Sequence, residues 1–209
     1  MGRTKSARLP LTHERIVAAA AKLLDAEGAE ALSARRLAAE LGCEAMSLYH
    51  HVPSMGDLVD HVVDQALAAL PEPRASDPPL AQVSAMARAY LALSRARPHL
   101  FRVVGTRRIH TAVGVRFQAR SIALLTAAGL SPRKALRASR VLFVYLNGAG
   151  LAVASWTLDA FTARLDAAPE VLEHLGKLSN RASVEKDALW GLDRLLDVVT
   201  ERGDAHDPP

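Results

Sequence analysis

The side chains best suited to contact a nucleic acid are concentrated in one stretch, residues 33–52. Two short helices, 33–41 and 44–51, are predicted on either side of a tight turn at Gly42 and Cys43. Apolar residues spaced to pack these helices together are Leu37, Ala38, Leu41 and Leu48. The side chains left outward on the second helix are Ala45, Met46, Ser47, Tyr49, His50 and His51. This pattern is typical of a helix-turn-helix motif, whose second helix enters the major groove of DNA.

Several of these residues also have simpler interpretations. Tyr49 has the spacing to pack half-buried on a preceding helix. His50 and His51 are not spaced as a metal site, because neighbours on a helix point about 100° apart. Cys43, the one cysteine, excludes a disulfide within the chain and is interpreted as a small residue of the turn.

Other chemistry has weaker support in the sequence. Asp57, Asp60, His61 and Asp64 follow i+3 and i+4 steps that suit a divalent metal, but a solvated, salt-bridged helix face is the favoured interpretation. No His-Glu-x-x-His, phosphate loop, Gly-x-Ser-x-Gly or dinucleotide motif is present, and Thr106-Arg107 has no nearby base. We therefore expect no enzymatic activity, no cofactor and no metal.

Helical periodicity extends along the chain and strand signals are nearly absent, so the expected fold class is all-α. Thr12 and Gly28 bound a first helix, Ser54 caps a helix at 55–70, and prolines mark a linker at 71–79. Further helices are predicted at 79–96, 98–104, 110–128, 132–157 and 184–201, and a short one within 159–183. The expected domains are a three-helix DNA-binding domain, 1–53, and a larger helical domain for effector binding and dimerisation, 54–209.

The stretch 141–158 contains no formal charge, which leaves two interpretations. A membrane span is one, although Asn147 and Gly148 interrupt it and it is slightly short of the roughly 20 residues needed. The favoured interpretation is a helix buried in the core and in an oligomer interface, where Gly148 and Ala152 let a partner helix approach. We expect no membrane association.

Charge is distributed unevenly, with net values of −3 over residues 1–77, +12 over 78–158 and −5 over 159–209. The overall +4 is therefore no argument for DNA binding. Two hypotheses remain for the central basic block, which contains no acidic residue. Its arginines pair with the acidic segment 159–209, or residues such as Arg107 and Arg108 form the entrance for an anionic effector.

Two neighbouring stretches closely resemble the DNA-binding domain of the TetR family of bacterial repressors: residues 32–42 (LSARRLAAELG) and 44–52 (EAMSLYHHV). Gly105-Thr106-Arg107 and the segment 128–131 (AGLS) are similar to the tetracycline-repressor branch. The resemblance implies a homodimer that binds a near-palindromic operator and releases it when a small molecule enters the larger domain. The expected dimer contacts are the helix at 132–157 and the C-terminal helix.

The resemblance also implies roles for individual residues. Ser33 would offer a backbone amide to a phosphate, and Arg35 would contact a base or a phosphate. Ala45, Met46 and Ser47 would face base edges, and Tyr49, His50 and His51 would contact bases or phosphates.

The sequence departs from the family pattern in three ways. Met55 replaces the lysine that usually opens the fourth helix, which removes a phosphate contact that Arg3, Lys5, Arg8 and Arg15 could replace. Ala45 and Met46 donate no hydrogen bonds, so any readout there is by apolar contact with thymine or by DNA shape. Residues such as Pro71 and Val103 stand where the tetracycline repressor binds a magnesium chelate, so that effector is not expected.

An effector pocket in the larger domain is expected to be mostly apolar with a few fixed polar groups. Asn147 is the first candidate, because a buried amide needs partners. The other candidates are His99, Arg107, His110, Gln118, Phe143 and Trp156.

These observations predict a cytoplasmic, ligand-responsive transcriptional repressor. No apolar secretory core follows the basic residues 1–10, which favours the cytoplasm. An activator or a ligand-independent regulator of the same fold is one alternative. A helical enzyme or carrier for an acidic metabolite, with structural N-terminal helices, is the other.

Overall fold

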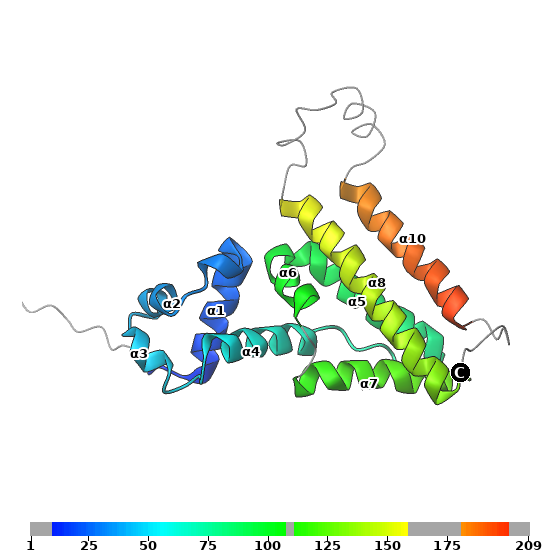
Figure 1. Cartoon of the computed structure of the whole chain (residues 1–209), viewed down its shortest axis with the longest axis horizontal. Coiled ribbons are helices and arrows are strands. Elements are labelled where there is room, and N and C mark those ends of the chain that lie inside the picture. The colour runs from blue at the N-terminus through cyan, green and yellow to red at the C-terminus, as the bar shows by residue number, and fades with distance from the viewer. Residues whose placement is uncertain (1–9, 108–110, 159–180, 201–209) are drawn as a thin grey trace, which may run out of the picture. The chain divides into compact units, whose positions relative to one another are not determined.

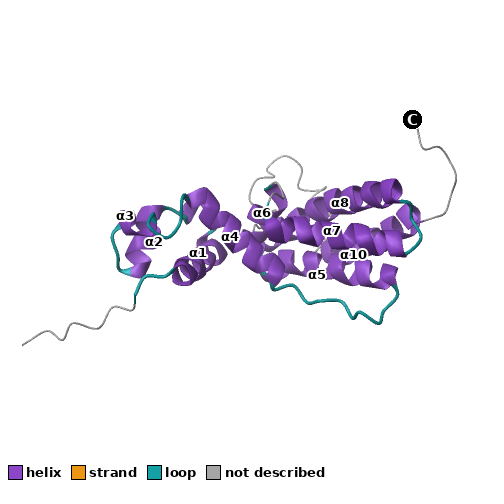
Figure 2. Cartoon of the chain, turned by 90° about the horizontal axis from the view of Figure 1, so that it is seen from below, coloured by secondary structure: helices purple, strands orange, loops and turns teal. Residues whose placement is uncertain are grey.

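A computed structural model describes residues 10–107, 111–158 and 181–200 of the 209-residue chain. Within these ranges the secondary structure is entirely helical, as predicted (Figures 1 and 2). The helices are α1 (His13–Glu27), a short 3₁₀ turn η1 (Ala29–Ala31), α2 (Ala34–Leu41), α3 (Ala45–Leu48), α4 (Met55–Ala68), α5 (Pro79–Ala96), α6 (Pro98–Thr106), α7 (Ala112–Ala127), α8 (Pro132–Leu158) and α10 (Arg181–Thr200).

Side-chain caps begin the helices where the sequence predicts them. Hydroxyl oxygens of Thr12, Ser33 and Ser54 accept hydrogen bonds from amides three residues later, at 3.3, 3.2 and 3.0 Å. Gly42 ends α2 in the left-handed conformation, with φ +69°. The starts of α1, α2 and α4 and the end of α2 can therefore be inferred from local sequence.

The third helix is shorter than predicted, because it ends at Leu48 rather than His51. The amides of Tyr49 and His51 donate to carbonyls three residues back, at 3.2 and 2.9 Å, which tightens the chain into turns. Pro53 follows, and proline disfavours helical geometry in the residue before it. Smaller differences are the end of α4 at Ala68 and the start of α10 at Arg181. The helix expected within 159–183 falls almost entirely outside the described residues.

The chain divides into two compact units, 1–65 and 66–209. This division falls later than the expected one after residue 53. The first turns of α4 belong with the DNA-binding helices: Leu58 and Val62 are fully buried there, and His61 packs edge-on against His13 of α1, with ring centroids 4.5 Å apart. Helix α4 continues through the division, and its last turn belongs to the second unit.

Helix α8 is the centre of the second unit and contacts α5, α6, α7 and α10 (Figures 1 and 2). By length and composition, its segment Pro132–Ser155 passes as a membrane span, with 39% of the apolar window buried inside the unit. The side of α8 that packs against these four helices is buried. Its residues with almost no solvent exposure include Ala135, Ala138, Leu142 and Ala154. This arrangement favours the interpretation of α8 as a core helix.

A close helix contact at Gly150 fixes α6 against α8. The ring of Phe101, which is completely buried, lies so near that a Cβ atom built at Gly150 would meet it at 2.3 Å. Phe101 also packs edge-on against Tyr90 of α5, with ring centroids 5.2 Å apart. One aromatic cluster thus joins α5, α6 and α8.

We expect Gly150→Ala to destabilise the second unit by about 1–3 kcal/mol, because the buried Phe101 ring has no free space to enter. Urea unfolding followed by circular dichroism measures the change. In a Phe101→Leu background the added methyl group should cost much less, because the two sites are coupled. Gly56→Ala, which meets its nearest atom at 3.4 Å, is the control. Equal costs of Gly150→Ala in both backgrounds would contradict this packing.

Candidate DNA-contacting surface and ligand cavity

Helices α2 and α3 pack through the residues that the sequence predicts. Leu37, Ala38 and Leu48 are buried, whereas Leu41 is only half-buried. The turn is closed by the Cys43 amide, which donates to the Ala38 carbonyl at 3.0 Å. Cys43 itself is a free, half-buried cysteine, consistent with a small residue of the turn.

The opposite side of this pair presents most of the predicted contact residues to solvent. Met46 is 71% exposed and Tyr49 is 42% exposed. Ser33, Arg35, His50 and His51 are also exposed, whereas Ala45 and Ser47 are half-buried. Tyr49 is therefore accessible enough to contact DNA, and its role stays a prediction.

Arg35 and its neighbour Arg36 have different environments. Arg36 donates to a carboxylate oxygen of Glu27 at 2.8 Å, so it ties α2 to α1. No described acidic residue pairs with Arg35, which is exposed one position earlier on α2. The guanidinium of Arg35 is thus available for a phosphate or a base edge.

The metal alternative on α4 finds no support among the described residues, where no group of three or more metal-binding side chains is assembled. Asp57 instead accepts a hydrogen bond from the Ser54 hydroxyl at 2.6 Å, and His61 packs against His13. These contacts belong to helix capping and packing.

A large cavity in the second unit has a volume of about 390 Å³. Its wall comprises the last turn of α4, the linker after it, and the facing sides of α5 and α7. The lining is apolar apart from three charged side chains: Leu67, Ala68, Leu70, Pro71, Glu72, Pro73, Met86, Ala89, Val113, Arg116, Phe117 and Arg120. Such a volume lies in the range of small-molecule sites.

A second cavity of about 30 Å³ lies behind Phe117, between α5, α7 and α8. Two predicted ligand residues, Gln118 and Phe143, line it. Another predicted ligand residue, Asn147, accepts a hydrogen bond from the Tyr90 hydroxyl at 2.7 Å. This is a polar contact between α5 and α8, as expected for an amide among apolar residues, and its role in ligand binding stays a prediction.

The remaining predicted ligand residues are not gathered at either cavity. His99 and Arg107 lie at the two ends of α6 and line neither cavity. His110 and the side chain of Trp156 fall outside the described residues. The sequence interpretation overlooked Arg116 and Arg120, although their i, i+4 spacing on one helix face was a usable signal.

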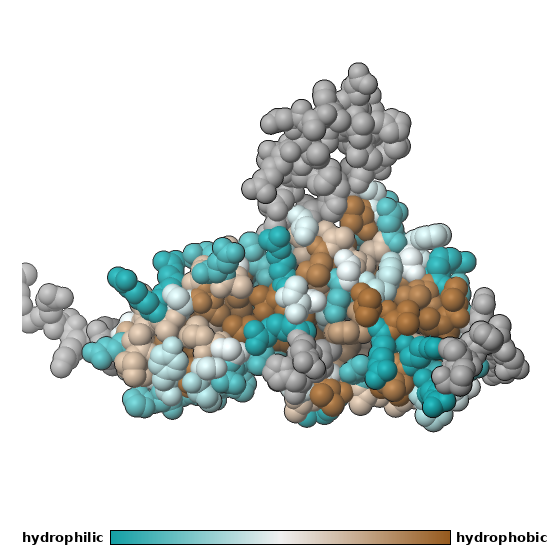
Figure 3. All heavy atoms as spheres, viewed as in Figure 1, coloured by the Kyte–Doolittle hydropathy of each residue, from teal (hydrophilic) through white to brown (hydrophobic). Residues whose placement is uncertain are grey.

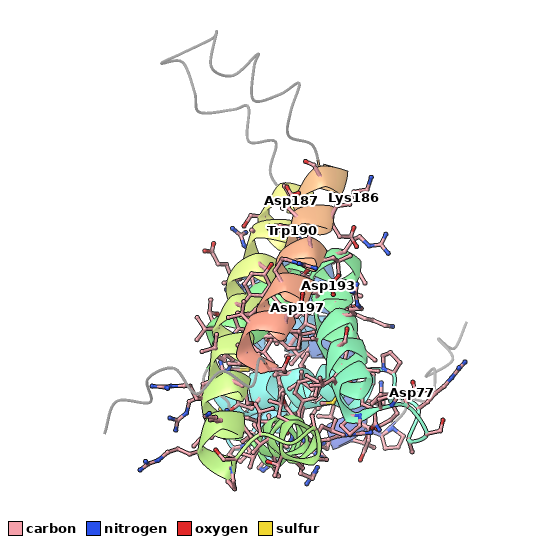
Figure 4. The ribbon with its side chains drawn as sticks, turned by 90° about the vertical axis from the view of Figure 1, so that its right-hand side faces the viewer. Asp77, Lys186, Asp187, Trp190, Asp193 and Asp197 are labelled. Carbon is pink, nitrogen blue, oxygen red and sulfur yellow. The ribbon has the colours of Figure 1, made fainter. Side chains whose placement is uncertain are left out.

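Arginines of the central basic block pair with acidic residues of α10, in agreement with the first hypothesis for the block. Arg88 bonds to Asp193, and Arg95 lies 3.3 Å from Glu185. Figure 4 shows Asp193 on the side of α10 next to α5. These pairs are half exposed, so each adds little stability.

Comparison with known proteins agrees with this arrangement. Residues 16–62 match the family model described as bacterial regulatory proteins, tetR family. Over 147 residues the chain is 38% identical to the HTH-type transcriptional repressor DrrR1 of Streptomyces coeruleorubidus, a match that covers 66% of this chain and 52% of that repressor. The crystal structure of the Streptomyces coelicolor TetR family protein ActR with actinorhodin is 30% identical, with a TM-score of 0.73, over 91% of this chain and 97% of that one. The chain belongs to the TetR family.

The part of this TetR-family chain that matches the DrrR1 repressor spans about half the length of that repressor. A second relative, an HTH-type transcriptional regulator of Saccharopolyspora erythraea, is 41% identical over 68 residues, which cover 29% of its length. These relatives are described as regulators of transcription, not as enzymes. Family membership confirms the resemblance inferred from residues 32–52 and the predicted all-α fold with an N-terminal helix-turn-helix.

Burial raises the pKa of Tyr90 above its ordinary value near 10. The stability that neutral Tyr90 contributes is complete below about pH 10 and is lost as the pH rises through the folded pKa. Tyr90→Phe should lower the unfolding free energy at pH 8 by about 1–3 kcal/mol, because Asn147 loses its partner. Tyr90→Phe should also flatten the decline of the unfolding free energy above about pH 10.

Urea unfolding at each pH measures this effect. The exposed Tyr49 provides the control for the loss of a tyrosine hydroxyl, because Tyr49→Phe should leave the unfolding free energy at pH 8 nearly unchanged. A Tyr90→Phe protein with the native slope would contradict the account.

Proposed function

We propose that this TetR-family protein is a cytoplasmic homodimeric repressor that releases its operator when a small molecule occupies the second unit. The observation that most supports this is the pairing of two features on one chain. An exposed helix-turn-helix surface occurs in the first unit, and a cavity of ligand size occurs in the second. A solved relative, ActR, is described in complex with actinorhodin and with (S)-DNPA, which agrees with ligand control of this fold.

In this proposal α3 enters the major groove, with Met46 and Ala45 making apolar contacts and Ser47 a polar one. Arg35, Tyr49, His50 and His51 contact the backbone or base edges beside it, and the Ser33 amide contacts a phosphate. Two such surfaces in a dimer would bind half-sites about 34–36 Å apart.

Helix α4 is the proposed link between effector and DNA. It begins at Met55 in the first unit, and Leu67 and Ala68 of its last turn line the large cavity. A ligand that prefers one placement of this turn shifts the population toward it. The effector releases DNA only if that placement disfavours the operator-binding form.

A DNA-binding assay tests the proposed function. Duplexes selected by the protein from a random-sequence library should bind at least about a thousandfold tighter than shuffled duplexes. Arg35→Gln should weaken binding about tenfold or more and Arg36→Gln much less, because Arg36 is held by Glu27. Fluorescence anisotropy across a salt titration gives both comparisons. Equal binding of selected and shuffled duplexes would refute the proposal.

Dimerisation is proposed through the outer faces of α8 and α10. Val144 is 72% exposed and Trp190 is 68% exposed, and Val141 and Val198 are also exposed. Figure 3 shows apolar side chains gathered over these two helices. A Cβ atom at Gly148, on the same α8 face as Val144, would meet nothing within 4 Å, so a second helix has space to approach.

We expect Val144→Glu or Trp190→Glu to convert the dimer to monomers, because a charge would be buried in the interface. Light scattering after size exclusion gives the mass. Val115→Glu on α7 places the same charge at another exposed valine and should leave the dimer intact. The proposed interface is wrong if Trp190→Glu and Val144→Glu proteins keep the mass of two chains.

A further inference from the structure

The large cavity has an unusual arrangement of charge. Arg116 and Arg120 lie one turn apart on the cavity side of α7, and Glu72 of the linker faces them. Glu72 is the one acidic residue among those that line the cavity. The α5 and α7 part of the wall belongs to the block 78–158, which contains no acidic residue. The apolar wall is therefore bordered by two cations and a single compensating anion.

Glu72 is the ion-pair partner of Arg120 in the structure. The Arg120 guanidinium pairs with the Glu72 carboxylate, and the Glu72 side chain is 77% exposed. No described acidic residue pairs with Arg116, which is exposed at the same border. An ion pair so accessible to water contributes little stability, so another carboxylate can replace Glu72 at small cost.

We propose that the effector is a lipophilic anion: an apolar body with an acidic group that replaces Glu72 on Arg120 and also contacts Arg116. This inference rests on the proposed function, since it concerns the ligand of the same cavity. Two guanidinium groups on one helix face offer forked donors that match a carboxylate or sulfonate. Phe117, Met86 and Val113 provide the apolar contact for the body.

Replacement of Glu72 also gives the ligand a route to the DNA-binding unit. Glu72 lies in the linker that directly follows α4, and its carboxylate holds that linker to α7. An acid that takes over Arg120 releases this tie while its body contacts Leu67 in the last turn of α4. The charged group and the apolar body thus act on the same end of α4.

Two fluorescent probes with the same apolar body test the charge preference. Anilinonaphthalene sulfonate is an anion, and N-phenylnaphthylamine is its neutral counterpart without the sulfonate. We expect the native protein to bind the anion about tenfold tighter. The Arg116→Gln/Arg120→Gln protein should lose this preference while it keeps its affinity for the neutral probe, because charged hydrogen bonds are removed and the apolar wall is retained.

Matched variants separate the cavity from general charge effects. Glu72→Gln should raise the affinity for the anion severalfold, whereas Asp77→Asn removes the same charge from the same linker outside the cavity and should not (Figure 4). Arg102→Gln on α6 is the control for the loss of an arginine. Ala89→Phe, which partly fills the cavity, should weaken both probes.

Equal affinity for the two probes, or an anion preference that survives the double arginine variant, would overturn the proposal. So would anion binding that is unchanged by Ala89→Phe, because the probe would then lie elsewhere. The titrations contain no DNA, so their result is independent of operator binding. A protein that fails to select DNA but shows the predicted probe preferences refutes the proposed function and supports the anion site.

Discussion

The second unit depends on the close approach of α6 to α8 at Gly150. Only the absence of a side chain there lets the buried Phe101 ring reach the α8 backbone, and that ring supports Tyr90 of α5. Tyr90 in turn donates to Asn147 of α8, and its ring lies 6.1 Å from Phe117 of α7. Two of the helices that wall the large cavity, α5 and α7, are thus positioned by one aromatic cluster.

This cluster explains why cavity and core are adjacent. Phe117 and Met86 line the large cavity, and both also line the smaller one. A ligand in the large cavity therefore contacts side chains that pack toward α8. Interiors are close-packed, so displacement of these side chains is transmitted to their neighbours and not absorbed locally.

Much of the first unit could be predicted from sequence because its signals are local. Thr12, Ser33 and Ser54 are capping residues, and Gly42 marks a left-handed turn. The exposed face of α3 follows from the burial of Leu48. The end of α3 was less predictable, since residues 49–51 continue the helical sequence pattern but form turns with hydrogen bonds three residues back.

The cavity was less predictable because it depends on contacts between distant residues. The partner of Asn147 is Tyr90, which lies 57 positions away in the sequence. Glu72 and Arg120 are 48 positions apart, and nothing local indicates that they meet. The basic block is visible in the composition, but the roles of its arginines depend on the fold. Arg88 and Arg95 pair with acidic residues of α10. Arg116 and Arg120 border the cavity.

The central claim is that occupancy of the cavity and DNA binding are coupled. The direct measurement uses the metabolite or antibiotic that most raises the melting temperature of the protein in a thermal-shift screen. Its effect on the affinity for the selected duplex is then determined by fluorescence anisotropy. The account predicts a loss of DNA affinity of about tenfold or more, with an equal loss of compound affinity when DNA is bound. A compound that stabilises the native protein, fails to stabilise Ala89→Phe and leaves DNA affinity unchanged would contradict it.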